Sequence, residues 1–424
     1  MAFEIISVIG LGYIGLPTAA MFASCKKNVI GVDVNENAVN IINRGEIHIV
    51  EPELDVLVQN AVRDGYLKAT ITPEPADAFI IAVPTPFKPC PRGVIPEPDL
   101  KYIEAAAKSI APVLKKGDLV ILESTSPVGA TEQMAEWMAE ARKDLTFPQQ
   151  NGEKSDIRIA HCPERVLPGH VVRELVENDR VIGGLTAKCS ELAVELYKIF
   201  VRAECVITNA RTAEMAKLTE NSCRDVQIAF ANELSIICDE LDIDVWGLIS
   251  LANRHPRINI LQPGPGVGGH CIAVDPWFIV SKTPEQAQLI HTARKVNDAK
   301  PEWVINKVKI AIADFLQANP DKTSKDVTIA CYGLAFKPDI DDLRESPALD
   351  ITKMISEFHA GEVLAVEPNI SELPQSLKGV QLSTLSEALK AGDIHVLLLD
   401  HKDFKLVRPE NGLLIDTKGI WRKK

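Results

Sequence analysis

The stretch "EIISVIGLGYIGLPTAAMFASCKKNVIGVDVN", residues 4–35, decides the fold of the N-terminal part of the chain. It reads as a strand, a turn with glycines at 10, 12 and 15, an alanine-rich helix and a second strand that leads to Asp33. In such a unit the first glycine makes the tight turn, the second lets the backbone approach a pyrophosphate, and the third lets helix and strand pack closely. The helix start offers its N–H groups to the phosphates, and a carboxylate after the second strand receives the ribose hydroxyls. We therefore expect an NAD site, favoured over NADP, formed by Gly10, Gly12, Tyr13, Ile14, Gly15 and Asp33.

Two later segments, residues 76–87 and 117–131, read as buried parallel strands that end in polar turns, with a helical segment at 99–116 between them. Ligands of an open α/β sheet lie beyond the carboxyl ends of its strands. We therefore expect the hydroxyls of Thr85, Thr125, Ser126 and Thr131 near the cofactor. The alternative is that they serve turns and helix caps.

Bulk composition limits the class of protein. The chain has 424 residues, 46% of them hydrophobic, which indicates two or three domains. A formal net charge of −12 argues against a general nucleic-acid binder. The start "MAFEIISVIG" lacks a signal-peptide pattern, and no apolar run approaches the roughly 18 residues of a membrane span. We therefore expect a cytoplasmic protein, in which nine scattered cysteines without CxxC pairs do not form a disulfide framework. No Cys/His spacing supports a metal site.

The middle of the chain predicts one long helix, because residues 211–241 contain neither proline nor glycine and have apolar positions at helical intervals. Lys217, Asn221 and Arg224 recur at i, i+4 and i+7, so they share one stripe of that helix. A solvated face is the default interpretation of such a stripe. A helix of this length is also a plausible dimer element.

The C-terminal third predicts a second doubly wound domain. Strands are expected within 326–337, 362–368, 393–400 and 412–421, together with a helix within 341–358 that has Ser346 at its N-cap and Pro347 at its first position. This domain has no GxGxxG, so we expect it to hold another nucleotide or none.

The loop "QPGPGVGGHCIAVDPW", residues 262–277, places Cys271 behind a series of glycines that leave the thiol sterically open. In a dehydrogenase, such a thiol can add to an aldehyde formed by a first hydride transfer. A second hydride transfer gives a thioester that water cleaves to a carboxylate, with two NAD consumed. Asp275 is placed to orient the water, and Lys217 with Asn221 to stabilise the alkoxide-like oxygen.

The ordered motifs "GLGYIGLP", "VPTP", "ESTSPVGAT", "CPER", "EMAKLTENS", "GPGVGGHCIAVD" and "GLAFKPDIDDLRESPA" resemble the UDP-glucose/GDP-mannose dehydrogenase family along essentially the whole chain. The resemblance implies an α/β fold with two Rossmann-like domains joined by a central helical region. The implied domains are an NAD domain at 1–205, a dimerisation and catalytic region at 206–315, and a UDP domain at 316–424.

The resemblance also implies roles for single residues. The nucleophile falls on Cys271 and the catalytic lysine on Lys217, with Asn221, Asp275 and Glu164 of the "PE" motif beside them, while Arg344 matches a position that touches NAD. The positions that match sugar-nucleotide contacts, besides Lys217 and Asn221, are Arg165, Val166, Arg224, His255, Arg257, Gly268, Phe336, Lys337 and Arg422. The counterpart of Arg257 reaches the neighbouring subunit's active site, which implies a homodimer.

One departure from the family pattern bears on the substrate. UDP-glucose dehydrogenases commonly have a lysine where this chain has Val274, and the loop between Arg257 and Cys271 is shorter here. Both differences favour a UDP-linked 2-acetamido sugar over UDP-glucose. UDP-N-acetylglucosamine, UDP-glucose and a two-electron oxidation of the hydroxyacid type, with Cys271 only a loop residue, stay open as alternatives.

Overall fold

The computed structural model describes residues 3–49, 51–91, 93–166, 169–269 and 271–422. The chain forms two compact units, Met1–Glu220 and Asn221–Lys424. The border between them lies inside one long helix, α9 (Ala210–Glu240).

The first unit is built on an eight-stranded sheet with the order β3-β2-β1-β4-β5-β6-β7-β8. The first six strands in this order are parallel, β7 is antiparallel to β6, and β8 is parallel to β7. The order reverses between β1 and β4, and a crevice at such a point is where doubly wound sheets bind ligands. The strands are β1 (Ile5–Ile9), β2 (Asn28–Val32), β3 (Leu67–Thr70), β4 (Ala78–Ile81), β5 (Leu119–Leu122), β6 (Arg158–His161), β7 (Arg180–Gly184) and β8 (Cys205–Asn209).

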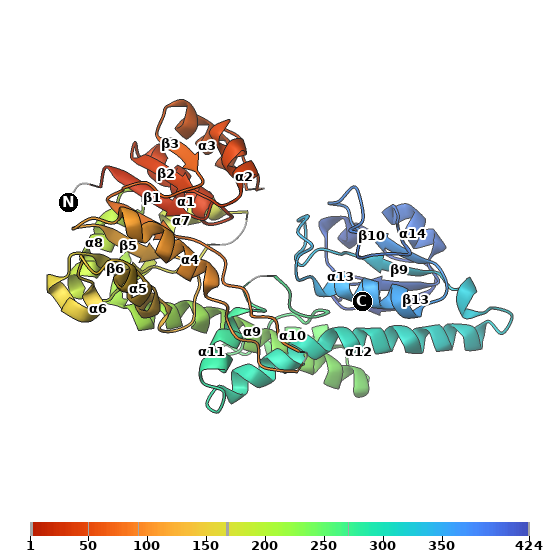
Figure 1. Ribbon diagram of the computed structural model, residues 1–424. Coiled ribbons are helices and arrows are strands. Elements are labelled where there is room, and N and C mark those ends of the chain that lie inside the picture. The colour runs from red at the N-terminus through yellow and green to blue at the C-terminus, as the bar shows by residue number, and fades with distance from the viewer. Residues whose placement is uncertain (1–2, 50, 92, 167–168, 270, 423–424) are drawn as a thin grey trace. The chain divides into compact units, whose positions relative to one another are not determined.

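Helices cover both faces of this sheet, as the N-terminal part of Figure 1 shows. One core joins the sheet to α1, α2, α3, α7 and α8, and the other joins it to α4 and α5. The helices are α1 (Gly15–Ser24), α2 (Glu36–Asn43), α3 (Leu54–Arg63), α4 (Lys101–Ile110), α5 (Ala130–Ala141), α6 (Pro148–Asn151), α7 (Val171–Glu177) and α8 (Ala187–Tyr197). The expected strands at 76–87 and 117–131 are confirmed as the fully buried β4 and β5.

The second unit contains a five-stranded parallel sheet with the order β11-β10-β9-β12-β13. Its strands are β9 (Ile329–Tyr332), β10 (Val363–Val366), β11 (Val380–Leu382), β12 (Ile394–Leu397) and β13 (Leu413–Asp416). One face packs against α12 (Gln288–Ala318) and α13 (Pro347–Phe358), and the other against α14 (Leu385–Ala391), Phe404 and Trp421. The second doubly wound domain is therefore confirmed, with β11 as a strand that the sequence pattern did not reveal.

The remaining helices of this unit connect the long ones. They are α10 (Val245–Ala252) and α11 (Asp275–Lys282). The predicted helix at 211–241 is confirmed as α9, and the predicted N-cap is confirmed because Ser346 Oγ accepts a hydrogen bond from Leu349 N at the start of α13. No helix in the described part of the chain combines the length and apolar character that crossing a bilayer requires.

Candidate active site

The glycine turn between β1 and α1 gives each glycine a different surrounding. Gly10 has φ of 92°, and a Cβ there would lie 2.5 Å from the Ala82 carbonyl oxygen. A Cβ on Gly15 would lie 1.7 Å from the Gly10 carbonyl oxygen, which shows how closely helix and strand pack. A Cβ on Gly12 would meet no atom within 4 Å. Only Gly12 therefore faces open space, as a backbone that receives a pyrophosphate must.

The other residues of the predicted cofactor set lie around this turn. Tyr13 is exposed and Ile14 is the half-buried residue directly before α1. Asp33 follows β2, and its carboxylate accepts hydrogen bonds from Leu11 N at 2.8 Å and Asn35 N at 2.9 Å. These bonds fix the carboxylate beside the glycine turn. The residues present therefore fit a dinucleotide with ribose hydroxyls at Asp33 and phosphates at Gly12.

The four predicted hydroxyls have different partners. Thr85 donates to the Thr125 carbonyl, which ties the ends of β4 and β5 together. Ser126 is buried at 1% exposure, with no hydrogen-bond partner among the described residues. Thr131 donates through both its N–H and its hydroxyl to Glu214 Oε1, at 2.8 and 2.6 Å. Glu214 also accepts from Gly129 N at 2.6 Å, so it caps the positive end of α5.

Glu164 belongs to a buried cluster that the sequence did not reveal. Its carboxylate lies 2.8 Å from Arg180, which also pairs with Glu123 at 3.4 Å. Tyr197 donates to Glu123 at 3.0 Å, and Arg165 N donates to Glu164 at 2.6 Å. Burial raises the pKa of Glu123 to about 7, with the cation of Arg180 opposing the rise and Glu164 adding to it. One buried cation therefore supports Glu164.

Two of the predicted catalytic residues meet at the end of the loop of residues 262–277, which we call the glycine loop. Cys271 is exposed and lies one turn before α11, where its carbonyl accepts from Asp275 N at 2.9 Å. Asp275 is buried at 3% exposure, and its carboxylate accepts from Asn221 Nδ2 at 2.5 Å. The structure therefore places Asn221 beside Asp275, and both of them in the same compact unit as Cys271.

Helix α9 carries the predicted stripe. Lys217 is half-buried, Asn221 is half-buried one turn later, and Arg224 is exposed. The stripe is therefore not uniformly solvated.

Four predicted substrate residues lie outside the helix, two of them before α7 and two after α10. Arg165 forms an ion pair with Glu220 of α9 at 2.6 Å, and Val166 is half-buried against the first core of the sheet. His255 and Arg257 are exposed on the turn that follows α10. Asn253 closes that turn, because it donates to the Ile260 carbonyl at 2.9 Å and accepts from Ile260 N at 2.7 Å.

In the second unit, the glycine loop rests on the turn that follows β9. A Cβ on Gly268 would lie 2.3 Å from the Glu345 carbonyl oxygen, and Phe336 packs against Gly268 and Gly269. Lys337 is exposed beside it. Arg344 pairs with Asp342 at 2.6 Å, and Arg422 pairs with Asp244 at 3.1 Å, so both cations have acidic partners in their own unit.

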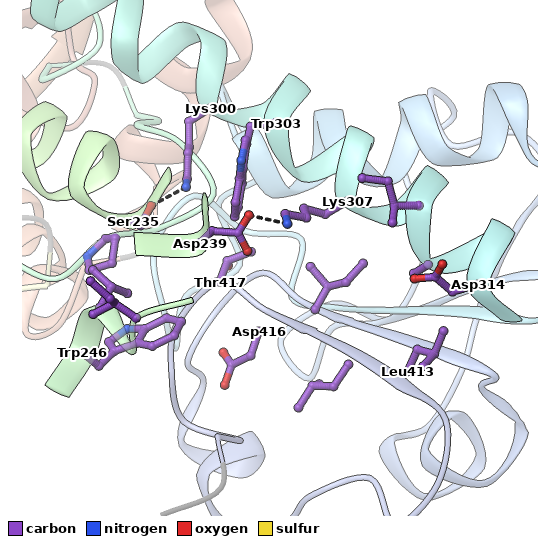
Figure 2. Close-up of a pocket in the computed structure, with 17 residues that line it drawn as sticks. Ser235, Asp239, Trp246, Lys300, Trp303, Lys307, Asp314, Leu413, Asp416 and Thr417 are labelled. Atoms are coloured by element: carbon purple, nitrogen blue, oxygen red, sulfur yellow. Dashed lines mark hydrogen bonds and ion pairs between the residues drawn. The ribbon is translucent and has the colours of Figure 1, made fainter. Parts of the chain in front are cut away.

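The second unit also contains a cavity of about 410 Å³ between the C-terminal half of α9, α12 and β13. Figure 2 shows Lys300 directed toward Ser235 and Lys307 toward Asp239 along its edge. None of the predicted site residues lines this cavity. The cavity is therefore not part of the predicted site.

Sequence reasoning missed Glu214, Glu123 and Arg180. Glu214 lies one turn before Lys217 inside a motif that had been noticed, but its partner Thr131 is 83 residues away. Glu123 and Arg180 are 57 residues apart. No local pattern could have joined either pair.

Comparison with known proteins agrees with this arrangement. Three models of the UDP-glucose/GDP-mannose dehydrogenase family match the chain: the NAD binding domain at residues 4–201, the central domain at 211–299 and the UDP binding domain at 330–423.

Individual relatives match over the full length. The UDP-N-acetyl-D-mannosamine dehydrogenase of Yersinia pestis is 68% identical over 100% of both chains. An NDP-N-acetyl-D-galactosaminuronic acid dehydrogenase of Ralstonia nicotianae is 62% identical over 100% of this chain and 97% of its own. The solved UDP-D-ManNAc dehydrogenase of Pyrococcus horikoshii has 37% identity and a TM-score of 0.85, over 99% of this chain and 96% of its own. The chain belongs to the UDP-glucose/GDP-mannose dehydrogenase family, with that family's NAD-binding domain at its N-terminal end and its UDP-binding domain at its C-terminal end.

Proposed function

We propose that this protein is an NAD-dependent UDP-N-acetyl-D-mannosamine 6-dehydrogenase, which oxidises the C6 hydroxyl of its substrate to the carboxylate. The observation that carries the proposal is the 68% identity, over the full length, to an enzyme of that name. The contact between Asn221 and Asp275 in the unit that holds Cys271 supports it, because this chemistry needs a thiol, a carboxylate and an oxyanion donor. The product would serve surface-polysaccharide synthesis of the enterobacterial common antigen type.

The first oxidation gives an aldehyde from the C6 alcohol. NAD, when bound, accepts the hydride in each of the two oxidations. Lys217 and a water held by Asp275 take up the hydroxyl proton, and Asn221 donates a hydrogen bond to the oxygen on which negative charge develops. Since Asn221 also binds Asp275, one carboxamide sets the position of both the water and the substrate oxygen.

The second oxidation proceeds on Cys271. The thiol adds to the aldehyde carbon and its proton passes to the oxygen, which gives a thiohemiacetal. Loss of a second hydride and a proton leaves a thioester. Water then adds at the thioester carbon, the C–S bond breaks, and the carboxylate and the Cys271 thiol are formed. Glu164 is the second carboxylate available for this water, and Arg180 holds it in place.

Assembly as a homodimer and a cytoplasmic location complete the proposal. Phe230 and Ile237 are exposed by 52% and 45% and share one stripe of α9, and Leu241, exposed by 61%, directly follows the end of that helix. This exposed apolar surface suits pairing with a second copy. The nine cysteines form no CxxC pair in the sequence, a pattern that suits a reducing compartment.

The stoichiometry of NADH tests the chemistry. With limiting UDP-N-acetylmannosamine we expect two NADH per sugar, and far slower turnover with UDP-N-acetylglucosamine, UDP-N-acetylgalactosamine or UDP-glucose. The Cys271→Ser variant should release no uronate. One NADH per sugar would favour the two-electron alternative, in which Cys271 is only a loop residue. Equal rates with all four sugars would reject the assignment of the substrate.

A further inference from the structure

Asn232 is a fully buried carboxamide on α9, far along the helix from the predicted stripe. Its Oδ1 accepts a hydrogen bond from Gly264 N at 2.9 Å, and its Nδ2 donates to Asn297 Oδ1 at 2.9 Å. Both ends of the side chain are therefore used. Gly264 lies at the beginning of the glycine loop that leads to Cys271.

The orientation of this chain of amides is fixed at both ends. A backbone N–H can only donate, so the oxygen of Asn232 must face Gly264, and its nitrogen must face Asn297. Asn297 in turn donates to the Asp225 carboxylate at 2.8 Å, which can only accept. If either side-chain amide were rotated by 180°, an acceptor would face an acceptor or a donor would face a donor.

The network ends on a buried ion pair between the two long helices. Arg294 of α12 lies 2.6 Å from Asp225 of α9, and both side chains are at most 2% exposed. Arg294 also binds Asp298. A buried ion pair with further hydrogen bonds makes a stiff anchor, because losing either partner leaves an uncompensated charge. The amide chain therefore starts from a rigid point.

The loop needs such anchors because its own backbone offers little stiffness. Gly266 has φ of 154° and Gly269 has φ of 83°, values that favour glycine. Because glycine has no Cβ, the backbone at these positions is conformationally free. Downstream of Cys271, Asn221 holds Asp275 at 2.5 Å, and between the two ends Gly269 N donates to the Glu345 carbonyl at 3.2 Å. Two asparagines of one helix thus hold the two ends of the loop.

We propose that Asn232 is a positioning residue, which sets the place of the Cys271 thiol by holding Gly264. It does not touch the reacting atoms. Its effect passes through the loop, so its removal should lower kcat while leaving the binding of NAD unchanged. The inference rests on the proposed function only for the measurement of kcat.

The test compares Asn232→Ala with Asn43→Ala. Asn43 serves as the control, because it is an asparagine that holds a backbone segment away from the glycine loop: it donates to the Ala69 carbonyl at 2.9 Å and accepts from Ala69 N at 2.8 Å. We expect Asn232→Ala to reduce kcat at least about tenfold, since small misplacements of reacting groups are costly. The KM of Asn232→Ala for NAD should differ from the wild-type value by less than about twofold. Asn43→Ala should keep the wild-type kcat.

A second readout is independent of the reaction. The rate at which iodoacetamide alkylates Cys271, measured by mass spectrometry without substrate, should change at least about threefold in Asn232→Ala and not in Asn43→Ala. If wild-type enzyme yields only one NADH, the proposed function fails but this comparison still decides the role of Asn232. If Asn232→Ala does not fold, Asn232→Leu replaces it, because a side chain of similar shape fills the space and still removes the acceptor for Gly264. A folded variant with unchanged kcat and unchanged alkylation rate would overturn the inference.

Discussion

At the scale of single residues, the three glycines of the turn between β1 and α1 serve two different purposes. Gly10 and Gly15 lie where a Cβ would meet backbone atoms within 2.5 Å, whereas Gly12 faces open space. The same motif therefore contains two glycines that the fold requires and one that a ligand requires.

Substitutions should reveal this difference. Gly12→Ala should fold with a melting temperature close to that of the wild type and should bind NAD about tenfold or more weakly, because the methyl group occupies the space for the pyrophosphate. Gly15→Ala should instead lower the melting temperature markedly, because its Cβ would lie 1.7 Å from the Gly10 carbonyl oxygen.

Circular dichroism and titration calorimetry with NAD measure the two effects. A Gly12→Ala variant that binds NAD as well as the wild type would show that the open space at Gly12 does not hold phosphate. The variant must first be shown to melt normally, since partial unfolding also weakens binding.

The sequence predicts the role of a side chain where its hydrogen-bond partner lies in the same local unit of the chain. It does not do so where the partner comes from a distant segment. The Ser346 cap and Asp33 follow from local patterns, because each side chain bonds a backbone group of the same strand–turn–helix unit. Asn232 bonds Gly264, 32 residues away, and Asn297, 65 residues away. Only the packing of α9 against its neighbours brings these groups together, so no spacing could predict them.

At the scale of elements, α12 shows how tertiary packing overrides a local signal. The sequence contains Pro301 near the middle of this 31-residue helix, and proline normally ends or kinks a helix. The helix continues because Val304, Ile305 and Val308 enter the core of the second sheet. The unpredicted strand β11 is only three residues long and half-exposed, and so short an edge strand has little pattern to read.

Lys300 on α12 makes a prediction about pH. Its side chain is 1% exposed, donates to Ser235 at 2.5 Å and lies 3.6 Å from the centre of the Trp303 ring (Figure 2). Burial lowers the pKa of Lys300 to about 7, although Asp239 opposes this shift. Between pH 7 and the ordinary pKa of the unfolded chain, the unfolded state holds the additional proton. The free energy of unfolding should therefore rise with pH through this interval.

The Lys300→Met variant should lack this dependence. Its stability relative to the wild type should be greatest at pH 7 and below, and should fall by about 1.4 kcal/mol for each pH unit above 7. Urea unfolding at pH 6.5, 8 and 9 measures it. Lys307→Met is the control, because Lys307 lies on the same helix as Lys300 but is 32% exposed and pairs with Asp239 of α9. A difference between Lys300→Met and the wild type that stays constant with pH would contradict the burial of an uncharged amine.

At the scale of the whole molecule, α9 carries predicted catalytic residues of both compact units. The border between the units falls between Glu220 and Asn221, so Lys217 belongs to one unit and Asn221 to the other, one helical turn apart. The covalent geometry of one helix therefore fixes their spacing. The expected domain borders after 205 and 315 fall inside β8 and α12, elements whose extent depends on pairing and packing partners distant in sequence.

Arg257 allows the proposed homodimer to be tested through the active site itself. Arg257 is exposed on the turn closed by Asn253, so its side chain is available to another chain. If it acts in the neighbouring subunit, a heterodimer of Cys271→Ala and Arg257→Ala subunits has one site with both defects and one intact site. Such heterodimers, purified through two different tags, should show about half of the wild-type kcat although each parent variant is inactive.

The matched control pairs Cys271→Ala with Lys217→Ala, because we assign both residues to the site of their own subunit. Each site of that heterodimer keeps one defect, so no activity should return. Recovery in the Arg257 pair alone would establish a shared active site. It would also explain why the apolar stripe of Phe230 and Ile237 lies exposed on α9 of a single chain. No recovery in either pair would assign Arg257 to its own subunit and leave the stripe as the remaining argument for a dimer.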